Sequence, residues 1–478
     1  MRAQLKRVPR AAWWCAAVAL VTSLAWSMLT PPYHVPDENS HLAYVQYVAE
    51  TGNLPVRTPD RPPYSPEQNA LLDALHFYEV IGRVGNRPPL TAADSALLRK
   101  VQHEDLGRVG PDVNNATDNG PLYYLLAAVP YGLTPSSDLL DRMVVIRWLS
   151  ALFAALSALV VFLFVRELLP NDPWTWPIGG LLAALEPMVG FLGGGVTPDD
   201  LLVLISSATI LAAARILRRG LTTKRAVVLG LLAVAGALTK PAYFGMVPGA
   251  VVALLAGVVV ARRRETVRAA GIGAAAAAAV AAFYLLLTHT ILERTAQAAE
   301  VVPAGEHGWN ERLSYIWQLF LPRLPFQNDL ITGFPLHDLW APRLLGQFGW
   351  LDYGYPQWVY DVFWWTCVAI LVGVVVALVR GRSAVRRHAL ELFVYATFVA
   401  GMLFAIGYVD YRSRITGTAL FEQGRYLLPL LALMIGAVCV ALRGLGARWG
   451  RPIGALLVMA MLAATVFGQL LTVQRFYG

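Results

Sequence analysis

Long apolar runs recur along the whole chain, and they limit its possible folds more than any other feature. Eleven segments approach the roughly 20 residues that an α-helix needs to cross a bilayer. They lie at about 11–30, 143–168, 176–195, 200–219, 224–241, 243–261, 268–290, 359–380, 388–409, 425–443 and 452–473. Of the 478 residues 56% are hydrophobic and only 15% are charged. The sequence therefore predicts an all-α polytopic membrane protein with about eleven transmembrane helices.

The formal net charge of +8 would suggest nucleic-acid binding in a soluble chain, but here the basic residues gather in short loops between apolar runs. Such loops face the cytoplasm under the positive-inside rule. With the N-terminus in the cytoplasm and an uncleaved first anchor, eleven spans place the clusters at 218–225, 262–268, 380–387 and 443–451 inside. A further span at 121–133 would reverse them, so this short apolar piece is predicted to be interfacial or re-entrant. We expect a plasma-membrane protein with no nucleic-acid partner.

Two long segments then face the outside, residues 31–142 and 291–358, within a single transmembrane domain covering 1–478. The first is expected to carry juxtamembrane helices, including a helix-like piece at 65–81. The second is rich in aromatic residues, and its stretch 309–326 reads as an amphipathic segment lying in the membrane interface.

Two carboxylates and an imidazole directly follow the first apolar run, in Pro36-Asp37-Glu38-Asn39-Ser40-His41. Charge at that depth is costly unless it is used or paired. Pro36 favours a helix start, where Asp37 and Glu38 would lie in the first turn. His41 is four and three residues further on, so the three side chains can share one face. The alternative is an ordinary capped juxtamembrane helix.

Several other unusual groups collect on the same predicted side. Asp199 and Asp200 follow Pro198 at the start of the fourth span, Lys240 ends the fifth, and Arg425 opens the tenth. Each has a plain structural explanation when taken alone, because cations at helix ends snorkel and aspartates cap helices.

Together these residues suit the transfer of a sugar from a lipid phosphate. A base must take the proton of the acceptor hydroxyl, and a carboxylate serves. Positive charge, from a cation or a metal, must stabilise the departing phosphate. A membrane-embedded donor would place its phosphate at the height of these helix ends.

At these residues the chain resembles the GT-C superfamily of membrane glycosyltransferases, and within it a bacterial family of polytopic proteins. The matching motifs, spread over 31–430, are Pro36-Asp37-Glu38-Asn39-Ser40-His41, Gly120-Pro121-Leu122-Tyr123-Tyr124, Pro198-Asp199-Asp200, Lys240-Pro241 and Gln423-Gly424-Arg425-Tyr426-Leu427-Leu428-Pro429. Gly120 departs from the commoner Pro-Pro-Leu-Tyr form.

The resemblance implies a role for each matching residue. Asp37 would be the general base or would position the acceptor, with Glu38 beside it as a second catalytic acid. Lys240 and Arg425 would hold the donor phosphate, and His41, Tyr123 and Tyr426 are assigned to substrate binding. A divalent cation (Mg²⁺ or Mn²⁺), which some members of the superfamily bind and others do not, maps to Asp37, Asp199 and Asp200.

The expected activity is an inverting glycosyl transfer, of a hexose or a pentose, on the external membrane face. The donor would be a polyprenyl-phosphate-linked sugar and the acceptor an envelope glycan, lipid or protein. The chain shows no large soluble C-terminal domain of the oligosaccharyltransferase kind, so a peptide acceptor bound in that way is not expected.

Two readings from other classes stay open. A transporter or a flippase for lipid-linked glycans would place ionisable groups near the bilayer midplane, often at broken helices in repeated halves. Here no repeat is visible, and Glu186 alone among the singled-out charges lies mid-span. A non-catalytic assembly partner in envelope biosynthesis would tolerate Asp37→Asn with little loss.

Overall fold

Helices dominate the chain in the computed structural model, which describes residues 8–55, 63–104, 106–110, 115–136, 138–261, 308–330, 336–416 and 423–478, with a few isolated positions between 268 and 282. Within these ranges eight helical stretches are long and apolar enough to cross a membrane, or nine if one bent pair counts as a span. They comprise α2 (Arg10–Leu29), α8 (Leu139–Leu168), α11 (Asp199–Arg219), η2 (Pro241–Met246) with α13 (Val247–Ala261), α17 (Gln357–Arg380), α19 (Ala389–Thr416), η3 (Gly424–Leu430) with α20 (Leu431–Gly444), and α21 (Gly446–Phe476). The polytopic all-α prediction is confirmed.

The predicted count of eleven spans is not settled by these helices. The segment predicted at 224–241 forms α12 (Thr223–Ala237), which has only 15 residues. The segment 268–290 lies almost wholly outside the described residues.

The segment predicted as one span at 176–195 is broken in the middle. It forms α9 (Thr175–Ala184) and α10 (Pro187–Gly193), which meet at an angle of 52°. Pro187 has no N–H to continue the helix, so backbone carbonyls before it lose their partners. The Thr465 hydroxyl of α21 donates to the Leu185 carbonyl at 2.6 Å, which satisfies one of them inside the bundle.

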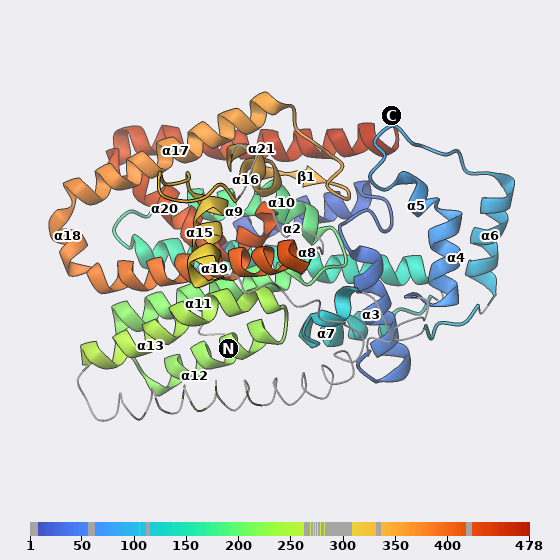
Figure 1. The fold of residues 1–478 in the computed structure, drawn as a ribbon, viewed down its shortest axis with the longest axis horizontal. Coiled ribbons are helices and arrows are strands. Elements are labelled where there is room, and N and C mark those ends of the chain that lie inside the picture. Colours follow the sequence, from blue (N-terminus) through green and yellow to red (C-terminus); the bar gives the residue numbers. More distant parts are fainter. Residues whose placement is uncertain are drawn as a thin grey trace.

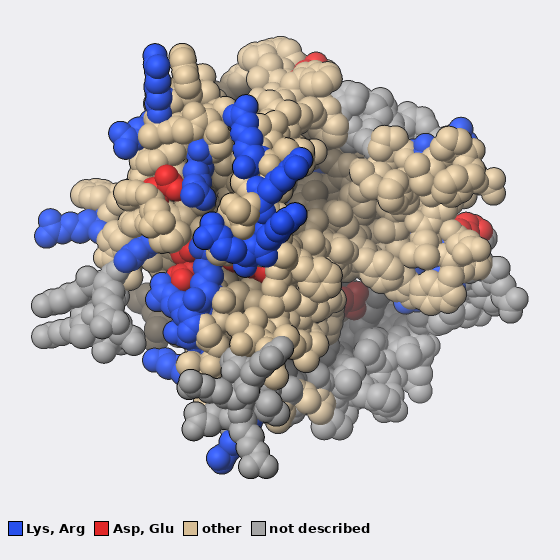
Figure 2. All heavy atoms as spheres, turned by 90° about the vertical axis from the view of Figure 1, so that its left-hand side faces the viewer, with Lys and Arg blue, Asp and Glu red and all other residues tan. Residues whose placement is uncertain are grey.

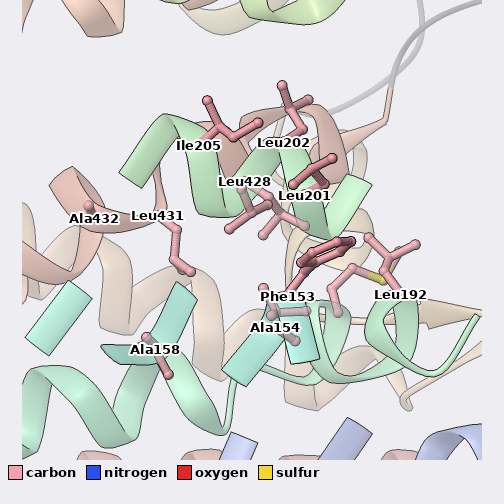
Figure 3. Close-up of a cluster of buried hydrophobic side chains, with 14 of the residues drawn as sticks. Phe153, Ala154, Ala158, Leu192, Leu201, Leu202, Ile205, Leu428, Leu431 and Ala432 are labelled. Carbon is pink, nitrogen blue, oxygen red and sulfur yellow. The ribbon is translucent and has the colours of Figure 1, made fainter. Parts of the chain in front are cut away.

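The centre of the bundle is α8, which packs against α2, α9 and α11. Figure 3 shows part of the buried cluster where α8 meets α11 and α20, with Phe153 and Ala158 of α8, Leu201 and Ile205 of α11, and Leu431 of α20. Because lipid tails are as apolar as these side chains, close van der Waals packing, rather than escape from water, holds such helices together.

The first long segment folds into a helical cap at one end of the bundle. Its elements are α3 (Glu38–Thr51), α4 (Pro66–Ala74), α5 (Phe77–Val80), α6 (Ala92–His103), η1 (Asn115–Asp118) and α7 (Leu122–Leu133). The predicted helix at 65–81 is split because His76 adopts a positive φ of 51° between α4 and α5. The short apolar piece forms α7, which packs on α3 and is too short to count as a span.

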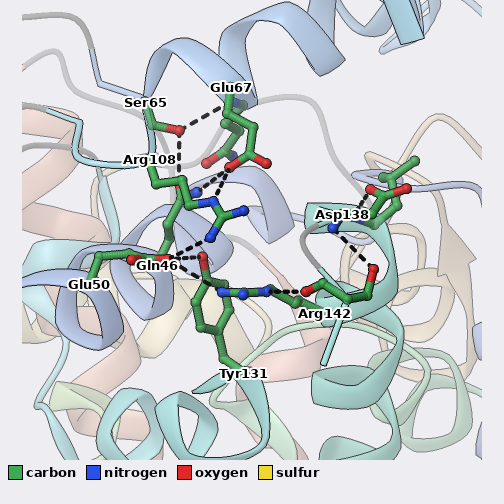
Figure 4. Close-up of polar contacts among 11 residues, drawn as sticks. Gln46, Glu50, Ser65, Glu67, Arg108, Tyr131, Asp138 and Arg142 are labelled. Atoms are coloured by element: carbon green, nitrogen blue, oxygen red, sulfur yellow. Dashed lines mark hydrogen bonds and ion pairs between the residues drawn. The ribbon is translucent and has the colours of Figure 1, made fainter. Parts of the chain in front are cut away.

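A polar network ties the cap together (Figure 4). Gln46 of α3 donates to Glu67 at 2.9 Å and accepts from Ser65 at 2.8 Å. The Tyr131 hydroxyl of α7 donates to Glu50 at 2.8 Å. These bonds hold α4 and α7 on either side of α3.

The second long segment contains α15 (Trp309–Phe320), α16 (Leu336–Leu345) and a two-stranded antiparallel sheet, β1 (Gln347–Phe348) with β2 (Tyr353–Gly354). Helix α15 exposes Trp309 and Leu313 but buries Leu319, as expected for an amphipathic interfacial helix. The Trp350 indole donates to the Tyr33 carbonyl at 2.9 Å, which joins the second long segment to the first.

The two ends of the bundle differ in charge. Figure 1 places α18 (Arg382–Arg387) at one end of the long axis and α4, α5 and α6 at the other. Figure 2 looks onto the α18 end, where Lys and Arg side chains gather. Ion pairs Arg218–Glu391 and Arg443–Asp172 join loops that the sequence placed on one side. The described basic loops therefore share one end, called the basic end below; its cytoplasmic orientation stays a prediction.

Candidate active site

Asp37 lies at a strained turn directly before α3. Its φ of 61° is left-handed, and Tyr33 four residues earlier has φ 68°. Such a conformation costs a non-glycine residue about 1–3 kcal/mol and often marks a functional position. The Asp37 side chain does not cap the helix; it is 40% exposed, and its Oδ2 lies 3.2 Å from Nη2 of Arg425. The end of the bundle that carries the helical cap, opposite α18, is called the Asp37 end below.

Glu38 has a completely different environment from its neighbour. It is fully buried and forms a two-pronged ion pair with Arg147 of α8, at 2.8 Å and 2.7 Å. The Val196 N–H donates to the same carboxylate at 2.9 Å. Arg147 also donates to the Ser27 and Thr30 carbonyls at the end of α2. Glu38 thus ties the start of α3 to α2, α8 and the loop before α11.

A second acid–cation pair lies where α11 and η2 begin. Pro198 precedes Asp199, the first residue of α11, as the sequence predicted. Lys240 is the residue before η2, and its Nζ lies 2.5 Å from Oδ1 of Asp199. Lys240 and Arg425 lie 5.6 Å and 5.4 Å from the centre of the Tyr426 ring. The two acid–cation pairs are therefore neighbours, with Tyr426 against both cations.

His41 joins this group from the first turn of α3. Its Nδ1 lies 2.9 Å from the Tyr124 hydroxyl, which accepts from Asn119 at 3.2 Å. Tyr124 in turn stacks on Tyr44 with ring centres 3.6 Å apart. Burial lowers the pKa of His41 to about 4, with a smaller opposing effect of the Asp37 charge, so the ring is neutral near pH 7. Lys240, Asp199 and Arg425 also act electrostatically on this ring.

Of the residues predicted from the sequence, six therefore converge at the Asp37 end: Asp37, His41, Asp199, Lys240, Arg425 and Tyr426. Three take other positions. Glu38 is committed to Arg147, and Tyr123 is fully buried with its hydroxyl 3.0 Å from Ser150. Asp200 is buried too, and within the described ranges neither of its carboxylate oxygens has a hydrogen-bond partner.

Three residues of this region were given no site role from the sequence: Arg147, Tyr124 as the partner of His41, and Asn119. Arg147 could have been identified from the sequence, because an arginine within an apolar span requires a partner. The choice between Tyr123 and Tyr124 had no such signal, since both belong to the same motif and both are fully buried.

Close packing explains why position 120 is a glycine. A Cβ built on it would lie 2.2 Å from the Leu238 carbonyl oxygen. The same carbonyl accepts from the Leu122 N–H at 2.9 Å. This close approach docks the start of α7 against the segment that leads to Lys240.

The proposed cation ligands do not form a metal site in this arrangement. Asp37 and Asp199 lie against Arg425 and Lys240. In the part of the chain that the structure describes, no three His, Cys, Asp or Glu side chains are placed to hold a metal ion. The donor set does not fit a divalent cation, so no step is derived through one; the Mg²⁺ or Mn²⁺ expected from the resemblance stays a prediction.

Comparisons with solved structures give distant similarities. The oligosaccharyltransferase of Archaeoglobus fulgidus in the apo form is 11% identical, with a TM-score of 0.46; the match covers 98% of this chain and 56% of that one. The archaeal oligosaccharyltransferase AglB from Archaeoglobus fulgidus, in complex with an inhibitory peptide and a dolichol-phosphate, is 12% identical, with a TM-score of 0.46; the match covers 97% of this chain and 56% of that one. ArnT from Cupriavidus metallidurans bound to undecaprenyl phosphate is 14% identical, with a TM-score of 0.45; the match covers 94% of this chain and 63% of that one.

In these three matches the chain spans 56% to 63% of the length of the solved protein. No curated protein matches the chain. One family profile does, that of "Predicted membrane protein (DUF2142)", over residues 20–434. The match includes every residue of the candidate site, and the chain belongs to the DUF2142 family of predicted membrane proteins.

Proposed function

We propose that this protein is a membrane glycosyltransferase that moves a sugar from a polyprenyl-phosphate donor to a cell-envelope acceptor. The observation that carries the proposal is the convergence of a half-exposed carboxylate, Asp37, with two largely buried cations, Arg425 and Lys240. The choice of a polyprenyl phosphate follows the resemblance of the motifs and the position of Lys240 and Arg425 where membrane helices begin.

Asp37 is the proposed general base. Arg425 contacts one of its oxygens, and the exposure of the side chain leaves it accessible to an acceptor hydroxyl. The carboxylate takes the proton of that hydroxyl as its oxygen attacks the anomeric carbon of the sugar. Glu38 is not suited to this role, because Arg147 and the Val196 N–H occupy its carboxylate; we assign it to positioning Asp37.

Arg425 and Lys240 are the proposed partners of the leaving phosphate. As the bond from the anomeric carbon to the phosphate oxygen breaks, negative charge grows on the phosphate, and fixed cations stabilise it best where water is scarce. Asp199 and Asp37 neutralise these cations in the absence of donor. His41 and Tyr426 lie against the same charges and are proposed to contact the sugar or its phosphate.

A single displacement assisted by one base gives inversion at the anomeric carbon, so the proposed reaction is inverting. The transferred group is proposed to be a hexose or a pentose, and the acceptor an envelope glycan, lipid or protein. The site is proposed to face the outside of the plasma membrane, because the basic loops lie at the other end of the bundle.

The test is turnover of labelled polyprenyl-phosphate sugars by the purified full chain, comparing wild type, Asp37→Asn and the control Asp73→Asn. Asp73 is an exposed residue of α4 in the same helical cap. Loss of the base should lower turnover by about 10²–10⁴-fold, while the control keeps wild-type rates. Equal turnover by Asp37→Asn and wild type would remove Asp37 from the reaction.

One observation favours a lipid transporter instead, namely the bend of 52° between α9 and α10 beside Glu186. Broken helices near the midplane are typical of transporters. Here, however, the Glu186 carboxylate accepts from the Val189 N–H of its own helix at 2.6 Å, which is ordinary capping. A transporter would move the labelled donor across proteoliposomes without breaking its sugar–phosphate bond.

A further inference from the structure

Two hollows open at the basic end of the bundle, on the side opposite the candidate active site. The first, of about 680 Å³, lies between the ends of α8 and α11, the start of α19, and Trp176 of α9. The second, of about 600 Å³, lies between α8, α11 and α12. Arg166, Glu167 and Arg219 line both hollows, so they adjoin each other; together they are called the basic hollows below.

Positive charge exceeds negative charge in their lining. Seven Lys and Arg side chains face two carboxylates, Glu167 and Glu391. Those two acids are already used, since Arg219 pairs with Glu167 and Arg218 with Glu391. Lys224 and Arg387 form no ion pair with any residue in the described ranges. The surplus is visible in Figure 2 as a crowd of blue side chains.

The walls beside this charge are apolar and face outward. Val260 and Leu390 line the first hollow, and Val259 and Phe393 are exposed on the same helices, α13 and α19. Val228 lines the second hollow on α12, where Leu231 is also exposed. A ligand that fits must therefore carry an anionic group at the helix ends and apolar chains that lie along the helices.

We propose that the basic hollows bind an anionic phospholipid of the adjoining leaflet through its phosphate headgroup. Clusters of Lys and Arg at the ends of membrane helices attract anionic headgroups, at about 1 kcal/mol for each cation near the surface. The lipid phosphate lies among Arg166, Arg219 and Lys224, or against Arg387 in the first hollow, and its acyl chains pass along α12, α13 and α19. Trp176, with the Arg166 guanidinium 5.5 Å from the centre of its ring, lies at the headgroup level where tryptophan is favoured.

The experiment uses the purified full chain in nanodiscs that contain equal amounts of phosphatidylglycerol and phosphatidylcholine. The lipids that stay bound after extraction are counted by native mass spectrometry. The double variant Lys224→Gln, Arg387→Gln is compared with a matched control, Arg448→Gln, Arg451→Gln. The control removes two exposed cations from the same end of the bundle but outside the basic hollows.

Wild type and control should retain phosphatidylglycerol over phosphatidylcholine. Each hollow loses one cation in the double variant, so its preference for phosphatidylglycerol should fall by roughly fivefold, which is the equivalent of about 1 kcal/mol per cation. Equal preference in the variant and the control would overturn the proposal. Displacement of the bound lipid by millimolar inorganic phosphate would also overturn it, because the hollows would then take any phosphate and not a lipid.

This proposal does not depend on the glycosyltransferase activity. Turnover is measured on the same variants, and a change of turnover without a change of lipid preference counts against the lipid site.

Discussion

The two ends of the bundle differ in how their charged side chains are paired and buried. At the Asp37 end, three largely buried cations each pair with a carboxylate: Arg147 with Glu38, Lys240 with Asp199, and Arg425 with Asp37. At the basic end, Lys and Arg outnumber the acids and many are exposed. Paired and buried charge fixes geometry, which catalysis requires. Surplus charge in contact with solvent fixes no geometry, but it orients the chain and attracts anionic surfaces.

The sharpest test of this contrast is to break one ion pair at each end. Arg147→Met removes the partner of Glu38 and leaves a fully buried carboxylate without its cation. Breaking such a pair from one side typically costs about 3–5 kcal/mol. We expect a loss of that size in the free energy of unfolding, measured by denaturation in detergent.

The matched change at the basic end is Arg443→Gln, which breaks the pair with Asp172. The Arg443 side chain is 54% exposed, so the pair contributes at most about 1 kcal/mol. Similar losses for Arg147→Met and Arg443→Gln would show that the two ends do not differ as described.

A second test separates catalysis from topology. Arg425→Gln and Lys240→Gln each remove one cation proposed to stabilise the departing phosphate, and each should lower turnover by about 10²–10³-fold. The control, Arg382→Gln at the start of α18, removes a cation from the basic end and should leave turnover unchanged. Full activity in both site variants would place the phosphate elsewhere.

The opening residues of α3 show what the sequence could and could not predict. The apolar runs and the Pro-Asp-Glu motif placed a helix and two acids after the first span, and the structure has both. The sequence could not predict that Asp37 is half-exposed while Glu38 is buried, because a left-handed φ at Asp37 turns the two side chains apart. Only the position of Arg147, more than a hundred residues later, decides which acid is buried.

The broken span at Glu186 and the choice between Tyr123 and Tyr124 likewise depend on side-chain packing that the sequence does not reveal. Pro187 was visible in the sequence, but the direction of a bend depends on which helices pack on each side. The sequence did place Asp199 and Arg425 at the starts of spans and Lys240 at the end of one, all on the same side, because that follows from the order of spans and the charge of the loops alone. Residues whose position follows from topology were placed correctly, whereas contacts that depend on side-chain packing could not be predicted.

Acid should weaken the Asp37 end through His41. Its pKa is lowered from 6.5 to about 4 by burial, so between these values the unfolded chain binds more protons than the folded one. The contribution of His41 to the free energy of unfolding is complete above pH 6.5. It is lost as the pH falls towards 4, by about 3 kcal/mol in all. His41→Gln should flatten this part of the profile of unfolding free energy against pH. An unchanged slope would show that His41 is not buried as a neutral ring.

The smallest expected effect concerns divalent cations. Asp37 and Asp199 each lie against a basic side chain, and these two side chains, Arg425 and Lys240, are the cations proposed to stabilise the leaving phosphate. Under this proposal a chelator should change turnover less than about twofold, because the two fixed cations would take the part that a metal has in other phosphate sites. The measurement is turnover with and without EDTA, followed by addition of Mg²⁺ or Mn²⁺. A large loss that Mg²⁺ restores would mean that donor binding rearranges the carboxylates around a metal, and that Lys240 and Arg425 pair with them only in the empty enzyme.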